Sequence, residues 1–232
     1  MRYKNLVLIG SSHVSAESIN EVKETVEKKK PHIIAVELDQ DRLHALFNKG
    51  KRSFFIKGVG IKGMLFALIG AWVEKKIGKI VNVEPGSEMK AAVLLAKYHK
   101  LKLALIDQHI NITLRRFSET FTWKEKFRFL GDIVSSIFRP NKQLSDIGLK
   151  PENLNKVPSK ETIRKMLKYV KVRYPNIYQV LIYERNLFMA NALAQIMHKY
   201  PDEKIVAVVG AGHEEELIEM IKKNLTSLRK SI

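Results

Sequence analysis

Two segments near opposite ends of the chain each place a histidine three residues after a glycine that ends an apolar run. The two motifs are Gly10-Ser11-Ser12-His13 and Gly210-Ala211-Gly212-His213. In each motif the glycine allows a sharp turn and a close approach of the backbone to a ligand. An imidazole presented at such a turn can bind a metal ion or move a proton. We therefore predict that His13 and His213 face one shared site.

Apolar runs separated by helical patterns indicate how these histidines are positioned. The predicted strands cover residues 6–9, 33–38, 101–106 and 205–209. Nearly continuous apolar strands that alternate with helices are typical of a parallel sheet covered on both faces. The sequence therefore predicts an α/β fold with a mainly parallel central sheet of about four core strands. Ligands of such sheets bind outside the carboxyl ends of the strands, so we expect the site at this carboxyl rim.

Further polar residues follow the second and third predicted strands. Glu37 lies at the end of one strand and could act as a metal ligand or a general base. Asp39, two residues later, is better placed to cap the following helix. Asp107 and His109 follow the next strand, and both are candidates for substrate binding, with a helix cap or a structural hydrogen bond as the alternative for Asp107.

A polar triplet, Glu184-Arg185-Asn186, with two charged residues, stands inside an otherwise apolar helical stretch. Charges in such a stretch form either a surface stripe or a buried, paired set, because burial of an unpaired charge is unfavourable. In a site, Glu184 would be a ligand or base, and Arg185 would orient a carboxylate or a carbonyl oxygen. Arg116 could contact an anion, although a solvated helix face is an equal alternative.

The chain has no Pro/Gly/Ser-rich linker, so we expect a single domain over residues 1–232. Residues 50–80 and 111–175 interrupt the alternation of strands and helices, and we expect helical insertions there. The most apolar stretch, residues 58–73, is shorter than the ~20 residues that span a bilayer. The segment that contains it, residues 50–80, could form a lid, a homodimer contact or, through the basic residues in 52–79, a peripheral membrane contact.

The amino-acid composition limits which metal ligands and which binding partners we expect. The sequence contains no cysteine, so a metal site would use His, Asp or Glu, which suits Mn, Co or Zn. The net charge of +17 would attract anionic partners, but no nucleic-acid-binding motif accompanies it, and we expect no nucleic-acid partner. A Lys-rich, Cys-free composition is also common in archaeal or thermophilic proteins. The N-terminus has no signal-peptide pattern, so we expect a cytoplasmic protein, with membrane association as the alternative.

Several of these elements, in this order, resemble the TraB/PrgY family, which is named for pheromone shutdown and is related to the Tiki metalloproteases. The resemblance covers about residues 5–225. It rests on both Gly-x-x-His motifs and on four segments between them, 37–42, 86–91, 105–116 and 184–189. Many relatives continue into a hydrophobic C-terminal membrane region, whereas this sequence stops at Ile232.

The resemblance implies a fold shared with the erythromycin esterase and ChaN-like groups, dependence on a divalent metal, and peptidase activity. It places the metal ligands at His13, His213, Glu37 and Glu184, and the catalytic groups at Glu37, Glu184 and Arg185. We therefore expect a metal-dependent hydrolase of peptide substrates. Two alternatives remain open: a non-catalytic protein that binds a peptide or small molecule, and an esterase-like hydrolase that uses a histidine base without metal.

Overall fold

The computed structural model of the chain describes residues 1–11, 16–48, 86–138 and 159–230. Within these residues, five strands form one sheet in the order β1-β2-β5-β3-β4. The strands are β1 (Arg2–Tyr3), β2 (Leu6–Ser11), β3 (Ile33–Val36), β4 (Lys102–Leu105) and β5 (Ile205–Gly210). All neighbouring pairs are parallel except β1 with β2. The predicted α/β fold with four core strands is confirmed, and the two-residue β1 was not predicted.

The last strand in the sequence lies in the middle of the sheet. β5 pairs along its whole length with β2, from Leu6 opposite Ile205 to Ser11 opposite Gly210. On its other side it pairs with β3, where Val36 lies opposite Val208. The residues that follow β5 therefore lie next to those that follow β3, although about 170 positions separate them in the chain.

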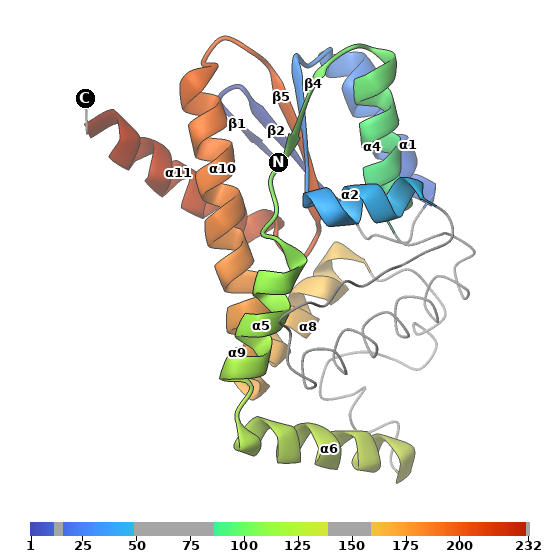
Figure 1. The fold of residues 1–232 in the computed structure, drawn as a ribbon, viewed down its shortest axis with the longest axis vertical. Helices are drawn as coiled ribbons and strands as arrows, with labels where there is room; N and C mark the ends of the chain where they lie inside the picture. The colour runs from blue at the N-terminus through green and yellow to red at the C-terminus, as the bar shows by residue number, and fades with distance from the viewer. Residues whose placement is uncertain (12–15, 49–85, 139–158, 231–232) are drawn as a thin grey trace.

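Helices cover both faces of the sheet and extend beyond its carboxyl rim (Figure 1). One face carries α1 (Ala16–Lys29) and α4 (Ser87–Tyr98), and the other carries α10 (Glu184–Lys199) and α11 (Glu214–Lys230). At the rim lie α2 (Gln40–Phe47), α5 (Ile110–Thr120), α8 (Lys160–Arg173) and α9 (Pro175–Tyr178), and α6 (Trp123–Phe138) crosses the far end. A π-helical turn, η2 (Gln179–Tyr183), joins α9 to α10.

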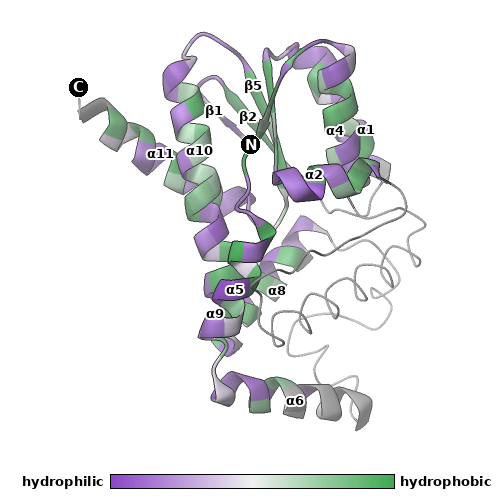
Figure 2. Ribbon diagram, viewed as in Figure 1, coloured by the Kyte–Doolittle hydropathy of each residue, from purple (hydrophilic) through white to green (hydrophobic). Residues whose placement is uncertain are grey.

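Alternating strand residues divide the core into two layers. Leu8, Ala35 and Ala207 face α10 and α11, where they pack with buried residues such as Leu193 and Leu217. The residues one position further along, such as Ile9 and Val208, pack instead against α1 and α4. β2 and β5 accordingly appear largely hydrophobic in Figure 2, whereas α2 at the rim is mostly hydrophilic. Burial on both faces explains why β2, β3 and β5 read as continuous apolar runs.

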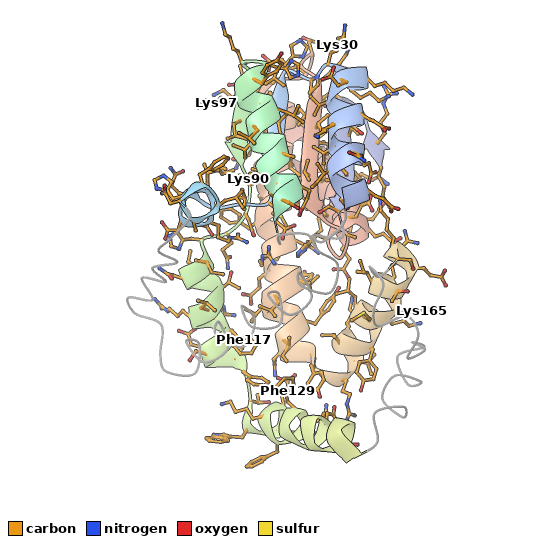
Figure 3. All side chains as sticks on the ribbon, turned by 90° about the vertical axis from the view of Figure 1, so that its right-hand side faces the viewer. Lys30, Lys90, Lys97, Phe117, Phe129 and Lys165 are labelled. Atoms are coloured by element: carbon orange, nitrogen blue, oxygen red, sulfur yellow. The ribbon has the colours of Figure 1, made fainter. Side chains whose placement is uncertain are left out.

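The first part of the helical insertion expected at 111–175 consists of two helices, α5 and α6. The backbone is extended at Phe121, and Thr122 accepts a hydrogen bond from the backbone of Glu125, so a new helix begins. An aromatic chain links the helices, since Phe121 contacts both Phe117 and Phe129. Figure 3 labels Phe117 on α5 and Phe129 on α6. The side chain of Asp132 binds that of Arg173, which ties α6 to the end of α8.

The segment expected at 50–80, and with it the membrane contact expected through 52–79, lies outside the described residues. Among the residues that are described, no helix is both long and apolar enough to cross a membrane.

Gly10, the glycine of the first Gly-x-x-His motif, leaves room for a buried carboxylate. A methyl group at Gly10 would lie 2.5 Å from Oε2 of Glu214, which begins α11. Glu214 is 4% exposed, and its carboxylate pairs with the N-terminal amine and with Lys160. Close approach of this side chain is therefore what requires a glycine here.

We predict that Gly10→Ala destabilises the protein by about 1–3 kcal/mol, the usual range for overpacking. The reason is that the added methyl group must displace the Glu214 carboxylate from its partners. The measurement is chemical denaturation followed by circular dichroism. Gly131→Ala is the matched control, because nothing lies within 4 Å of its added methyl group and alanine favours the helix by about 0.5–1 kcal/mol. Equal effects of the two substitutions would contradict this explanation.

Candidate functional site

Two buried carboxylates share one arginine at the carboxyl rim. Arg185, in the first turn of α10, donates hydrogen bonds to Glu37, which follows β3, and to Asp107, which follows β4. Its Nε lies 3.1 Å and 3.2 Å from the two oxygens of Asp107. Its Nη1 donates to the carbonyl oxygen of Leu181 at 3.2 Å. Burial alone would lower the pKa of Arg185, but the two carboxylates raise it. All three guanidinium nitrogens are thus engaged.

A second arginine extends this network towards α2. The guanidinium of Arg42 donates to Asp107 and, through Nε at 2.8 Å, to Asp39. Asp39 also accepts from the backbone N–H of Arg42 at 3.0 Å, so it caps α2 as predicted, and from the backbone of Ile110 at 3.1 Å. Burial would raise the pKa of Asp39, but these hydrogen bonds hold it below its usual value. The network therefore locks the ends of β3 and β4 and the starts of α2 and α5 together.

His213 completes the rim from the end of β5. Its Nε2 lies 3.4 Å from Oε1 of Glu37, and its Nδ1 lies 2.7 Å from Oδ1 of Asn186. The other oxygen of Glu37 accepts a hydrogen bond of 2.6 Å from the backbone N–H of Gly210. The side chains of His213 and Glu37 are each only 5% exposed. The second Gly-x-x-His motif thus brings its glycine N–H and its histidine to one carboxylate.

Beyond Asn186, the contacts continue to α11, α8 and α9. Asn186 Nδ2 donates to Oε2 of Glu216 at 3.3 Å. The other oxygen of Glu216 accepts from Lys171 at 3.0 Å and from the hydroxyl of Tyr178. Burial would raise the pKa of Glu216, but the hydrogen bonds from Tyr178 and Lys171 lower it. Burial and the same carboxylate raise the pKa of Tyr178 to about 12.

Three consecutive residues at the start of α10 point in three different directions. Glu184 pairs with Arg116 of α5 at 2.9 Å, Arg185 reaches the ends of β3 and β4, and Asn186 reaches Glu216 of α11. Successive side chains of an α-helix diverge by about 100°, so one turn can serve three directions. The π turn η2 comes immediately before, and such turns occur often at functional sites.

The predicted site residues accordingly fall into separate groups. His213, Glu37, Arg185 and Asp107 belong to one contact network. Glu184 and Arg116 form a pair of their own, which also contacts Glu119. His109 caps α5 through Nδ1, and its Nε2 lies 3.0 Å from Asp41 of α2. His13 lies outside the described residues, so its place beside His213 stays a prediction.

A metal ion would find only part of a ligand set in the residues that are described. His213 Nε2 and Glu37 Oε1 are two suitable donors that face each other. Within residues 1–11, 16–48, 86–138 and 159–230, no three His, Asp or Glu side chains form a group that could hold a metal ion. A complete set would therefore need a further ligand, and the predicted ligand His13 is in a segment outside these ranges.

Sequence reasoning assigned no site role to Asn186 or Glu216, and none to Arg42 or Ser11. Asn186 was visible as a polar residue in an apolar helical run, and it is fully buried. Glu216 could have been found as the residue one helical turn after His213. Ser11, at the end of β2, donates a hydrogen bond of 3.2 Å to Glu88, a carboxylate that is 1% exposed. No local pattern indicated that this pair would lie at the rim.

The fold and the rim define an α/β protein with a buried His–Glu–Arg–Asp network at the carboxyl ends of its parallel strands. Residues 3–224 match the TraB/PrgY/gumN family, so the chain belongs to this family.

The chain is similar to proteins from an archaeon and from mammals. The chain is 37% identical to the uncharacterized protein MJ1365 of Methanocaldococcus jannaschii, over 94% of this chain and 54% of that protein. It is 22% identical to the TraB domain-containing protein of Bos taurus, over 95% of this chain and 62% of the relative. The corresponding human protein is 21% identical, over 89% of this chain and 60% of its own length. The chain thus spans about half to three-fifths of these relatives.

We predict that Arg185→Met destabilises the protein by about 3–5 kcal/mol, because it leaves Glu37 and Asp107 buried without their shared cation. Denaturant unfolding at neutral pH measures the loss. Arg115→Met is the matched control, since Arg115 pairs with Glu119 on the exposed face of α5 and should contribute less than about 1 kcal/mol. A loss no larger than that of the control would show that the buried carboxylates do not depend on Arg185.

Proposed function

We propose that this chain is a hydrolase whose reaction centre lies between His213 and Glu37. One observation carries the proposal: Nε2 of His213 and Oε1 of Glu37 converge at 3.4 Å. The other nitrogen of this histidine is held by Asn186. Oε1 of this glutamate also accepts from Arg185, and its other oxygen is held by the backbone N–H of Gly210. Buried groups that such contacts hold in one orientation are typical of acid–base sites.

In the proposed reaction, Nε2 of His213 accepts a proton from the attacking water molecule as the new bond to the substrate carbonyl forms. The resulting imidazolium is stabilised by the carboxylate of Glu37, which lies close to the same nitrogen. When the scissile bond breaks, the imidazolium returns this proton to the leaving group. Arg185 acts on this step by holding Glu37 and Asp107 in place, because its three nitrogens are already engaged.

A divalent metal, Mn, Co or Zn, belongs to the same proposal. His213 Nε2 and Glu37 Oε1 are the described atoms that would bind it, and His13 would supply a further ligand. When bound, such an ion polarises a carbonyl and acidifies a water molecule. Glu184 remains a candidate ligand from the sequence, and its present partner is Arg116.

A peptide is the proposed substrate class, and the support for it is the resemblance to the Tiki metalloproteases. The described rim adds a compatible feature. Glu184 is 17% exposed and Arg116 is 43% exposed, so this pair presents both charge signs beside the buried network. Main-chain amides have a donor and an acceptor, and a surface of mixed charge can bind both.

We predict that the purified protein cleaves a fluorescent peptide library, and that His213→Ala reduces the rate at least about 100-fold, as expected when a general base is lost. His198→Ala is the matched control, because His198 is an exposed histidine at the end of α10 and should leave the rate unchanged. Elemental analysis of the wild type and of His213→Ala measures metal content in the same preparations.

The three proposals for this site give different results in that assay. Loss of activity with a chelator, and recovery with Mn, Co or Zn, supports the metal-dependent hydrolase. Activity that survives chelation but not His213→Ala supports a metal-free reaction with a histidine base. Stoichiometric peptide binding without any product would contradict the hydrolase and favour a binding protein.

A further inference from the structure

The two ring nitrogens of His213 face different partners, so the position of its proton determines what the ring can do. Nδ1 lies 2.7 Å from the side-chain oxygen of Asn186, and Nε2 lies 3.4 Å from Glu37. A neutral imidazole donates from one nitrogen and accepts at the other. The Asn186 amide has the same ambiguity, because its oxygen and nitrogen can exchange places by a flip. The remaining contacts of the network resolve both ambiguities.

Glu216 fixes the amide of Asn186. One oxygen of Glu216 accepts hydrogen bonds from Lys171, at 3.0 Å, and from Tyr178. A carboxylate that binds the Lys171 ammonium and accepts from a hydroxyl is in its ionised form, so Glu216 can only accept. The atom of Asn186 that lies 3.3 Å from its other oxygen must therefore be the NH2 group. The amide oxygen then faces His213.

Nδ1 of His213 must consequently donate. An amide oxygen and an unprotonated ring nitrogen would repel each other at 2.7 Å, and neither side chain can turn to water. Asn186 is 0% exposed and His213 is 4% exposed. Glu37 acts in the opposite sense, since a carboxylate beside Nε2 attracts the proton to that nitrogen. The contacts to Asn186 are thus what keeps a proton on Nδ1.

We propose that Glu216 and Asn186 are positioning residues that hold a proton on Nδ1 of His213 and so direct Nε2 to the reaction centre. The role at a reaction centre rests on the proposed function, but the protonation of Nδ1 does not depend on it. A general base needs an unprotonated Nε2 before it accepts a proton, and a metal ligand needs the same lone pair. The arrangement therefore serves a hydrolase with or without metal.

The wild-type protein tests the first half of the proposal directly. The full chain is labelled with 15N-histidine, and the ring signals of His213 are assigned by their absence in His213→Ala. Long-range 15N–1H spectra then show which nitrogen carries a proton. We expect the signal of Nδ1 in the range of a protonated nitrogen. An unprotonated Nδ1 would overturn the proposal.

Glu216→Gln tests the second half. Lys171 can only donate, so the carbonyl oxygen of the new glutamine stays on the side of Lys171 and its NH2 group faces Asn186. The Asn186 amide must then flip, and its NH2 group faces Nδ1 of His213. We expect the Nδ1 signal to move to the range of an unprotonated nitrogen and the proton to appear on Nε2, beside Glu37.

Tyr178→Phe is the matched control for this substitution. It removes one hydrogen bond to Glu216 but leaves the carboxylate, Lys171 and the contact to Asn186 in place. Nδ1 should therefore stay protonated. A Glu216→Gln protein that keeps Nδ1 protonated, or a Tyr178→Phe protein that loses this proton, would contradict the proposed role of Glu216. If Glu216→Gln does not fold, the wild-type spectrum still decides the state of Nδ1.

Failure of this inference can be distinguished from failure of the proposed function. The spectra require no substrate, and they can show a protonated Nδ1 in a protein that hydrolyses nothing. Conversely, an active enzyme that depends on His213 but has Nδ1 unprotonated would support the hydrolase and overturn the role of Asn186 and Glu216.

Discussion

The contact between Arg185 and two buried carboxylates is the interaction on which the arrangement of the rim depends. Glu37 and Asp107 end neighbouring strands, and their side chains would repel each other without a cation between them. A planar guanidinium can bind both at once, which a lysine ammonium does less well. Because Arg185 belongs to α10, the same contact also fixes this helix against the sheet and sets the direction of its neighbours Glu184 and Asn186.

Strand order explains why residues so far apart in sequence can form this network. β5 lies between β2 and β3, so the turn after it is adjacent to the end of β3. Gly210 can therefore donate its backbone N–H to Glu37, and His213 follows one short turn later. The same order places the end of β2, and with it the start of the first Gly-x-x-His motif, on the other side of β5. A topological switch of this kind is where α/β sheets usually bind ligands.

The sequence could predict which residues approach the rim but not which atoms meet. Apolar runs and their polar ends identified Glu37, Asp107 and His213, since these properties depend on local periodicity and on the parallel sheet. Asn186 and Glu216 were not identified, because their roles depend on the rotation of α10 after the π turn and on the packing of α10 against α11. The division between α5 and α6 was also missed, because the long amphipathic pattern concealed an extended residue at Phe121.

The net charge of the carboxylates and guanidiniums at the rim bears on the chemistry proposed there. The contacts of the described rim join three carboxylates, Glu37, Asp39 and Asp107, to two guanidiniums, Arg42 and Arg185. Before His213 is counted, this group therefore has one more negative than positive charge. Buried negative charge favours a cation nearby, and Nε2 of His213 lies 3.4 Å from Oε1 of Glu37, which also binds Arg185. A proton on Nε2 and a divalent metal both supply that charge. The electrostatics that hold the strands together thus also favour the proton transfer or metal binding proposed for this rim.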